Sequence, residues 1–440
     1  MKCLIIAAEK DSGQPQWYDN TALVPVLGVP LIERAIRSAI EAGADDFYVV
    51  TGNQGEYVQD FLDRLADHLK TPITSLVCKD REKENGFSVL QAREYLHEPF
   101  LLLTDDLLFD PSIARKLMEH PLADGEIIIA IDRNAQNSFF DLEDVTRVKT
   151  EDGKLKDIGN GLKESNGVDT GIVLCTPAIF ETLEHCVEKY GDASMSRAVR
   201  FLAARGQANT VDINGHFCID VANPVALQRA ENVLMADLRG KPNDGLLFRY
   251  FFRPLSGMLS RRLVNYRITP NQISFFSFFC CVLAAGLFAL GGYPALLLGG
   301  FLSLFAMIID CCDGAVARLK YQISEFGGWF DAVLDRYADA FLLFGLMWHA
   351  YADKMYSLIL FIGFLAIIGS FVLSYTADKY DSLMRDRITQ TKGFRVGREL
   401  RILLIFLGAL LNQAFFTLIL IAVIMNIETI RRVIICRDNG

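Results

Sequence analysis

Hydrophobic and polar positions follow two different patterns along the 440 residues of this chain. In roughly the first half, short apolar runs alternate with stretches whose apolar residues recur at helical spacing. From about Ile273 onward, long apolar runs dominate. The first pattern predicts a doubly wound α/β domain, with an open, mostly parallel sheet covered by helices on both faces. The second predicts an all-α membrane domain.

The alternating half provides specific candidates for its elements. Ligands in such sheets bind beyond the carboxyl ends of the strands, so the loop at 8–20, Asp105 with Asp106, and Asp220 are candidate site positions. The predicted strands are 3–7, 46–51, 100–104, 126–131, 170–175 and 209–213, and the predicted helices include 30–42, 56–69 and 88–95.

The apolar half predicts six membrane spans, because about 20 apolar residues cross a bilayer. A single span at 402–426 would replace the last two and give five. Six is preferred because basic residues gather between the fourth and fifth spans and after the sixth, which places both termini on the cytoplasmic side. The predicted spans are 272–291, 294–317, 326–350, 355–377, 396–411 and 413–430.

These patterns divide the chain into a cytoplasmic domain at 1–225, a juxtamembrane segment at 226–270 and a transmembrane domain at 271–440. The juxtamembrane segment interleaves arginines with apolar residues, as an amphipathic helix at a lipid headgroup layer does, although a plain linker helix would look similar. Residues 1–8 lack a signal-peptide cleavage pattern. We therefore expect a multi-pass protein of the inner cell membrane. The arginines are Arg249, Arg253, Arg261, Arg262 and Arg267.

Composition narrows the function only a little. The net charge of −9 averages a soluble half with a membrane half and gives no indication of nucleic-acid binding. The ten cysteines show no metal-site or disulfide spacing, so we interpret them as reduced core residues.

Four aspartates lie inside the apolar half, at 310, 313, 331 and 335. An ionised side chain at the bilayer centre costs roughly 2.5–3.5 kcal/mol, so four would cost on the order of 10 kcal/mol without compensation. Asp310 and Asp313 share one helix face, and Asp331 and Asp335 share a face of the next helix. The turn between these helices brings the two faces together at the cytoplasmic edge. The arrangement predicts a site for two hard divalent cations, Mg²⁺ or Mn²⁺, and for phosphoryl transfer.

The segment reads D-x-x-D-G-x-x-A-R, eight residues, then G-x-x-x-D-x-x-x-D, and it resembles the CDP-alcohol phosphotransferase family across roughly 240–435. The resemblance implies that the four aspartates bind metal and that Asp335 is also the general base. An acceptor alcohol would attack the β-phosphorus of a CDP-alcohol and release CMP. The family also implies a homodimer in a lipid membrane. The residues implied for the CDP site are Asn271, Ser274, Gly314, Ala317, Arg318, Ser324 and Gly327.

Other charged residues near this segment have two interpretations each. Arg395, Arg398 and Arg401 could hold the phosphate of a phospho-alcohol acceptor, or could be ordinary anchors at the cytoplasmic surface. Asp339 lies one turn beyond Asp335 and could touch the acceptor or face a wet cavity.

The N-terminal half is similar to MobA-like sugar-phosphate nucleotidyltransferases, on the runs LVPVLGVPLIERAIRSAIEAG, LLLTDDLLFD and GVDTGIVLCTPAIFE. More narrowly, it resembles the inositol-1-phosphate cytidylyltransferase half of bifunctional enzymes, in which Asp105 and Asp220 would hold magnesium. The family loop A-A-G-x-G-x-R reads AAEKDSG here, and Thr21 stands where the family has lysine. Glycines and cations cradle a triphosphate, so their loss predicts that nucleotidyl transfer is lost. Asp105 and Asp220 are then remnants, or serve binding or assembly.

Three functions remain in consideration. The first is a CDP-alcohol phosphotransferase that uses a CDP-inositol-like donor or CDP-diacylglycerol. The second is a bifunctional enzyme whose N-terminal domain also makes the CDP-alcohol from CTP. The third, from a different class, is a divalent-cation transporter with intramembrane aspartates along its pathway. A soluble domain that senses a ligand and gates the membrane half is a further variant.

Overall fold

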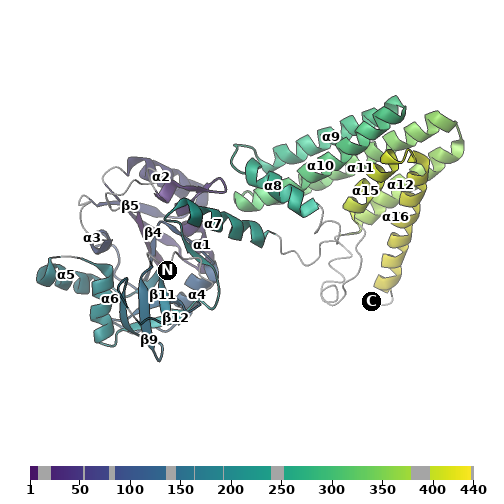
Figure 1. Ribbon diagram of the computed structural model, residues 1–440. Helices are drawn as coiled ribbons and strands as arrows, with labels where there is room; N and C mark the ends of the chain where they lie inside the picture. Colours follow the sequence, from purple (N-terminus) through teal and green to yellow (C-terminus); the bar gives the residue numbers. More distant parts are fainter. Residues whose placement is uncertain are drawn as a thin grey trace. The chain divides into compact units, whose positions relative to one another are not determined.

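The computed structural model describes residues 1–7, 21–52, 55–78, 85–134, 145–162, 164–191, 193–238, 252–377 and 397–437. The chain forms two compact units, Met1–Leu234 and Met235–Gly440, which are shown in Figure 1 and treated separately below.

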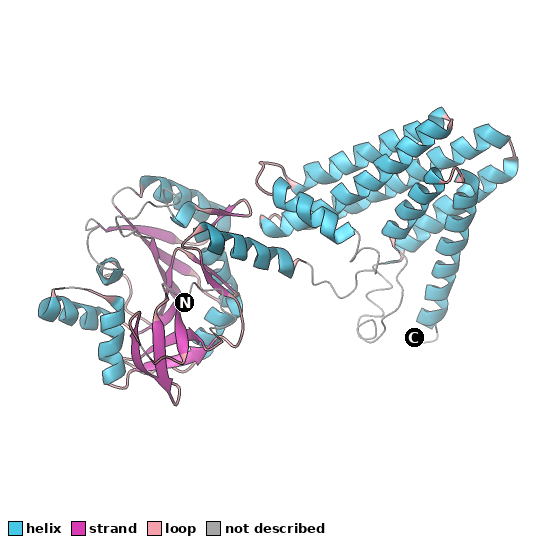
Figure 2. Ribbon diagram, viewed as in Figure 1, coloured by secondary structure: helices cyan, strands magenta, loops and turns pink. Residues whose placement is uncertain are grey.

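The first unit is built on a nine-stranded sheet with the order β5-β4-β1-β6-β11-β8-β12-β10-β9. Figure 2 shows the strands of this unit in magenta and the helices around them in cyan. All six predicted strands are present within a few residues of their predicted bounds. The strands are β1 Lys2–Ala7, β4 Asp46–Gly52, β5 Ile73–Cys78, β6 Phe100–Thr104, β8 Ile127–Asp132, β9 Arg147–Glu151, β10 Lys154–Gly159, β11 Gly167–Cys175 and β12 Ala208–Asp212.

The sheet is mixed, and the prediction of a mostly parallel sheet is correct for only one part of it. Strands β5, β4, β1 and β6 run parallel, whereas β11 pairs antiparallel with both β6 and β8. The reversal follows a hairpin between β9 and β10. Asp152 and Gly153 form its turn with φ of 51° and 77°, a left-handed backbone that suits an Asp-Gly pair.

Helices cover both faces of the sheet, as predicted. Alternate residues of β1 point to opposite faces, with Cys3 and Ile5 in one apolar core and Leu4 and Ile6 in the other. The helices are α1 Leu31–Ala42, α2 Glu56–Leu69 and α4 Pro111–Glu119 on the first core, and α3 Asn85–Leu90, α5 Ala178–Tyr190 and α6 Met195–Ala204 on the second.

Short elements complete this unit at the edge where the candidate residues lie. Strand β7 (Leu107–Phe109) pairs with β13 (Cys218–Asp220), so Leu107 lies opposite Asp220. A turn of 3-10 helix covers Thr21–Leu23, β2 and β3 are Pro25–Val26 and Val29–Pro30, and α7 is Pro224–Asp237.

The second unit is helical, and helices occupy all six ranges predicted as spans. By length and composition, three of the described helices could cross a membrane: α9, α10 and α12. The finer prediction of six spans is not confirmed, because α11 carries acids and α15 has only 13 residues, about 20 Å of helix. The helices are α8 Arg253–Leu263, α9 Pro270–Leu290, α10 Tyr293–Leu319, α11 Glu325–Lys354, α12 Ser357–Tyr375, α15 Arg398–Leu410 and α16 Ala414–Arg437.

The alternative of one span at 402–426 is wrong. Helix α15 ends at Leu410 and α16 begins at Ala414, and Asn412 between them has φ of 55°. A left-handed residue stops a helix, so the two segments form separate helices.

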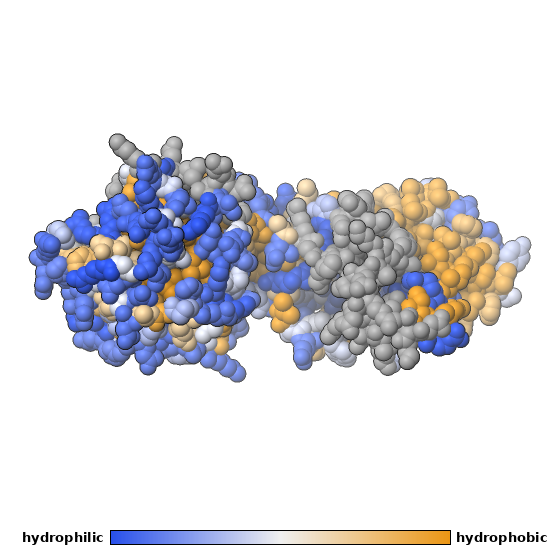
Figure 3. Space-filling model, turned by 90° about the horizontal axis from the view of Figure 1, so that it is seen from below, coloured by the Kyte–Doolittle hydropathy of each residue, from blue (hydrophilic) through white to orange (hydrophobic). Residues whose placement is uncertain are grey.

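The predicted juxtamembrane segment at 226–270 contains most of α7 and all of α8, which has Arg261 and Arg262 in its last turn. The place of this segment at a lipid surface stays a prediction. Leu259 and Leu263 of α8 pack on Ile273 of α9 and on Val316 of α10. Arg249 lies outside the described residues. Figure 3 shows hydrophobic residues gathered over the helical unit, as a membrane surface requires.

Helices α9 and α11 pack closely against each other. A Cβ atom on Gly345 of α11 would lie 2.5 Å from the Ala285 carbonyl oxygen of α9. Glycine therefore lets these two helices approach each other at backbone distance. At its start, α9 has a capping box in which Thr269 and Gln272 bond each other's backbone N–H groups.

Candidate active site

The four aspartates lie on two helices that face a common space. Asp310 and Asp313 are near the end of α10, and Asp331 and Asp335 are near the start of α11. The turn between the helices includes Tyr321 with φ of 56°.

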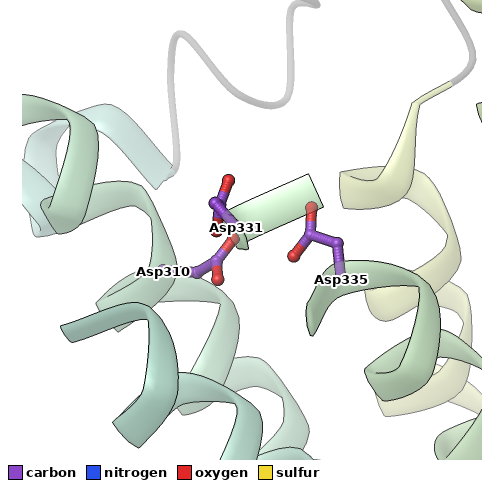
Figure 4. Close-up of side chains that lie close together, drawn as sticks. All are labelled: Asp310, Asp331 and Asp335. Carbon is purple, nitrogen blue, oxygen red and sulfur yellow. The ribbon is translucent and has the colours of Figure 1, made fainter. Parts of the chain in front are cut away.

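Three of the four carboxylates converge. One oxygen from each of Asp310, Asp331 and Asp335 lies within 4.8 Å of the others, and Figure 4 shows these side chains close together. Asp313 lies outside this group of three. Asp331 Oδ1 is buried and has no hydrogen-bond partner in the described part of the chain. Such an oxygen needs a cation or a proton, so the residues present fit a divalent metal ion.

Two serines of α9 hold the aspartates of α10. Ser274 Oγ donates to Asp313 Oδ2 at 2.6 Å, and Ser277 Oγ donates to Asp310 Oδ1 at 3.0 Å. Ser274 was predicted for the CDP site, but in this structure it contacts a metal-ligand candidate. Ser277, which is fully buried, was not singled out from the sequence. The signal was available, since the two serines have the same spacing as Asp310 and Asp313.

Arg398, the first residue of α15, joins the aspartates of both helices. Its Nη1 lies 2.6 Å from Asp310 Oδ2 and also contacts Asp335 Oδ1. Its Nε lies 3.3 Å from Asp339 Oδ1. Predicted Arg395 lies outside the described residues.

Asp339 is a buried ion-pair residue in this structure. Only 4% of its surface is exposed, and its Oδ2 lies 2.8 Å from Arg401 Nη2. Arg401 is equally buried and donates to the Ser370 carbonyl at 3.0 Å and to Ser374 Oγ. Asp339 therefore faces two guanidinium groups, and neither of the two interpretations from the sequence described this.

The remaining candidates for the CDP site form two groups. Along α10, Arg318 lies over Gly314, since a Cβ there would be 3.5 Å from Arg318 Nη1. Ala317 lies between them and accepts a hydrogen bond from the Gln322 N–H at 2.8 Å.

The second group lies at the starts of α9 and α11. Ser324 caps α11 by accepting from the Gly327 N–H at 3.0 Å. A Cβ on Gly327 would lie 3.3 Å from Asn271 Oδ1. The three residues are neighbours, and a larger residue than glycine would crowd them.

The N-terminal unit has a cavity of about 310 Å³ near its candidate aspartates. Asp106, Asp169 and Asp220 line it, and Asp105 is not among the described lining residues. Asp105 Oδ2 instead accepts from Thr21 Oγ1 at 3.0 Å. Burial raises the pKa of the Asp106 carboxyl and raises that of Asp169 to about 6. The altered nucleotide loop at 8–20 lies outside the described residues.

Known proteins match both halves of the chain. Residues 267–429 match the family described as CDP-alcohol phosphatidyltransferase, and residues 4–208 match the family described as MobA-like NTP transferase domain. A bifunctional IPC transferase and DIPP synthase of Rubrobacter xylanophilus is 30% identical over 431 residues, which cover 97% of this chain and 93% of that protein.

Two further similarities concern one half each. An archaetidylinositol phosphate synthase of Pyrococcus horikoshii is 31% identical over 179 residues, 40% of this chain and 87% of that protein. The solved inositol-1-phosphate CTP transferase from T. maritima has 17% identity and a TM-score of 0.47, and the match covers 52% of this chain and 94% of that one.

The helical unit is thus a phosphotransferase domain of the CDP-alcohol class, which depends on divalent metal. The chain belongs to the family that joins a MobA-like NTP transferase domain to a CDP-alcohol phosphatidyltransferase domain. Both resemblances drawn from the sequence are confirmed, and the chain is an enzyme. The matches give no support to a cation transporter.

Proposed function

We propose that the helical unit transfers a substituted phosphate from a CDP-alcohol to an acceptor alcohol. The acceptor oxygen forms a bond to the β-phosphorus, the bond from that phosphorus to the CMP oxygen breaks, and CMP leaves. The observation that carries this proposal is the convergence of the Asp310, Asp331 and Asp335 oxygens within 4.8 Å, on the helices that bear the family motif.

The aspartates would divide the work between metal binding and proton transfer. Asp310, Asp313, Asp331 and Asp335 would hold two Mg²⁺ or Mn²⁺ ions, which when bound would offset the charge of the diphosphate. Asp335 would accept the proton of the acceptor hydroxyl. Ser274 and Ser277 fix the carboxylates of α10 in place. Asn271, Gly314, Ala317, Arg318, Ser324 and Gly327 would line the CDP site.

The structure favours Arg398 as a contact for an anionic group of the acceptor. Its guanidinium lies among the converging carboxylates, where the reacting phosphorus would be bound. The donor would be CDP-inositol-like or CDP-diacylglycerol. A relative named archaetidylinositol phosphate synthase supports an inositol phosphate as one of the substrates.

Two observations about the N-terminal unit point in opposite directions. Relatives that match over nearly the whole chain are named as bifunctional, which favours a second activity that makes the CDP-alcohol from CTP. The loop sequence AAEKDSG and the Thr21–Asp105 contact count against it. We infer that nucleotidyl transfer is lost and that another protein supplies the CDP-alcohol.

The protein is further proposed to lie in the inner cell membrane, with the N-terminal unit and the aspartates on the cytoplasmic side. It would be a homodimer through the helical unit, as family resemblance implies. Crosslinking in native membranes tests the dimer, and labelling of introduced cysteines tests the orientation.

The main test measures CMP release by the full-length protein in detergent, with a panel of CDP-alcohols and acceptors and mass spectrometry of the products. Asp335→Asn should abolish CMP release. Asp353→Asn is the matched control, because Asp353 lies on the same helix and is exposed. Metal flux in proteoliposomes without CMP release would overturn the proposal. For the N-terminal unit, pyrophosphate release from CTP and inositol phosphate would overturn the inferred loss.

A further inference from the structure

Arg398 and a metal ion would use two of the same carboxylate groups, those of Asp310 and Asp335. Arg398 Nη1 touches Asp310 and Asp335, two of the three residues whose oxygens converge. A guanidinium group can donate to these oxygens or a divalent ion can bind them, but crowding and like charge oppose both at once. Because the Arg398 side chain is only 10% exposed, solvent screens this competition little.

The guanidinium is also tethered from its other side. Arg398 Nε lies 3.3 Å from Asp339 Oδ1, and Asp339 is itself held by Arg401 at 2.8 Å. Arg401 in turn bonds the backbone and a serine of α12. Asp339 and Arg401 therefore form a buried ion pair that holds Arg398 at Nε. The terminal Nη atoms of Arg398 could then change partners while Nε stays in contact with Asp339.

We propose that Arg398 couples metal binding to the binding of a phosphate group. It competes with the divalent ion for Asp310 and Asp335 until a substrate phosphate takes its guanidinium, and the freed carboxylates then bind metal more tightly. By thermodynamic reciprocity, metal must then favour phosphate binding by the same factor. This coupling rests on the proposed function. With an acceptor phosphate, it would keep the site weakly metallated until the acceptor is bound.

The test measures Mn²⁺ binding by electron paramagnetic resonance on the full-length protein in detergent, with protein-free blanks. The wild type is titrated alone, with inorganic phosphate as an acceptor-like probe, and with CMP as a donor-like probe. We expect one probe to raise Mn²⁺ affinity by about 5- to 150-fold, the range typical of coupled sites. The probe that does so identifies the source of the phosphate.

The variant Arg398→Gln should bind Mn²⁺ more tightly than the wild type in the absence of phosphate. Added phosphate should no longer raise the Mn²⁺ affinity of this variant. Arg432→Gln is the matched control, because it removes a buried guanidinium whose Nε lies 2.9 Å from Glu428 on α16. This variant should leave the Mn²⁺ affinity unchanged, both without and with phosphate. If Arg398→Gln does not fold, the wild-type titrations alone decide the matter.

Equal Mn²⁺ affinity with and without both probes would overturn the coupling, and so would weaker Mn²⁺ binding by Arg398→Gln. Neither result would affect the proposed function, which stands or falls on CMP release. Conversely, a protein that shows the coupling but releases no CMP would overturn the proposed function alone.

Discussion

Ser277 provides a direct test of how the aspartates are held. Its hydroxyl is fully buried, and it donates to Asp310 Oδ1 at 3.0 Å and lies at the same distance from the Ala306 carbonyl. The change Ser277→Ala removes the donor to Asp310 Oδ1, while Arg398 still contacts Asp310 Oδ2. A hydrogen bond to a charged group contributes about 1.5–3 kcal/mol.

That energy corresponds to roughly a 10- to 150-fold change in an equilibrium constant, since about 1.4 kcal/mol is tenfold. Removal of a partner of a metal ligand typically lowers metal affinity or activity by about 10- to 100-fold. We therefore expect Ser277→Ala to lower Mn²⁺ affinity and CMP release by one to two orders of magnitude, with the fold retained.

The assay is the same Mn²⁺ titration, accompanied by CMP release at the Mn²⁺ concentration that half-saturates the wild type. Ser303→Ala is the matched control, because Ser303 is equally buried in the same bundle and donates to the Gly300 carbonyl at 2.8 Å. The reasoning is refuted if Ser277→Ala binds Mn²⁺ like the wild type, or if both serine variants lose the same affinity.

Two further predictions concern packing and pH. Gly345→Ala should destabilise the helical unit by about 1–3 kcal/mol, because the new Cβ would lie 2.5 Å from a backbone oxygen. Thermal unfolding in detergent measures this loss. Gly286→Ala is the control, because a Cβ at Gly286 would have open space around it. The Asp169 carboxyl has its pKa raised from 3.8 to about 6, so its contribution to stability is present below about pH 4 and is lost as pH rises through 6. Asp169→Asn should therefore stabilise the N-terminal unit by up to about 3 kcal/mol at pH 7 and by little at pH 4, because asparagine can still accept from the Gly171 N–H. Calorimetry of the full chain at both pH values measures this difference. An equal gain in stability at both pH values would contradict the prediction.

Local patterns predicted much of this molecule. The six predicted strands exist because their apolar runs are bounded by turn residues, and α2 begins and ends where its pattern does. The β9–β10 hairpin was missed, although Asp152-Gly153 is a strong turn signal. Without that hairpin, the antiparallel direction of β11 could not be foreseen.

The candidate site shows the same division between local and distant interactions. Asp310 and Asp313, like Asp331 and Asp335, are spaced on their helices so that periodicity alone pairs them. The contact of Arg398 with Asp310 joins residues 88 positions apart, and no periodicity encodes it. Which of Asp105 and Asp106 lines the cavity depends on the twist at the end of β6, since neighbouring residues point to opposite sides of a strand.

The order of helices along the chain has a consequence for biogenesis. The aspartates and their serine partners lie on α9, α10 and α11, whereas Arg398 begins α15, which is synthesised after α12. A nascent chain therefore passes through a stage at which the carboxylates have been made and their guanidinium partner has not. With the proposed cytoplasmic orientation, magnesium would neutralise them at that stage and ease their placement at the membrane surface. We expect cell-free synthesis into lipid nanodiscs to yield less inserted protein when free magnesium is lowered within the range that translation tolerates, and four asparagines in place of these aspartates should remove that dependence.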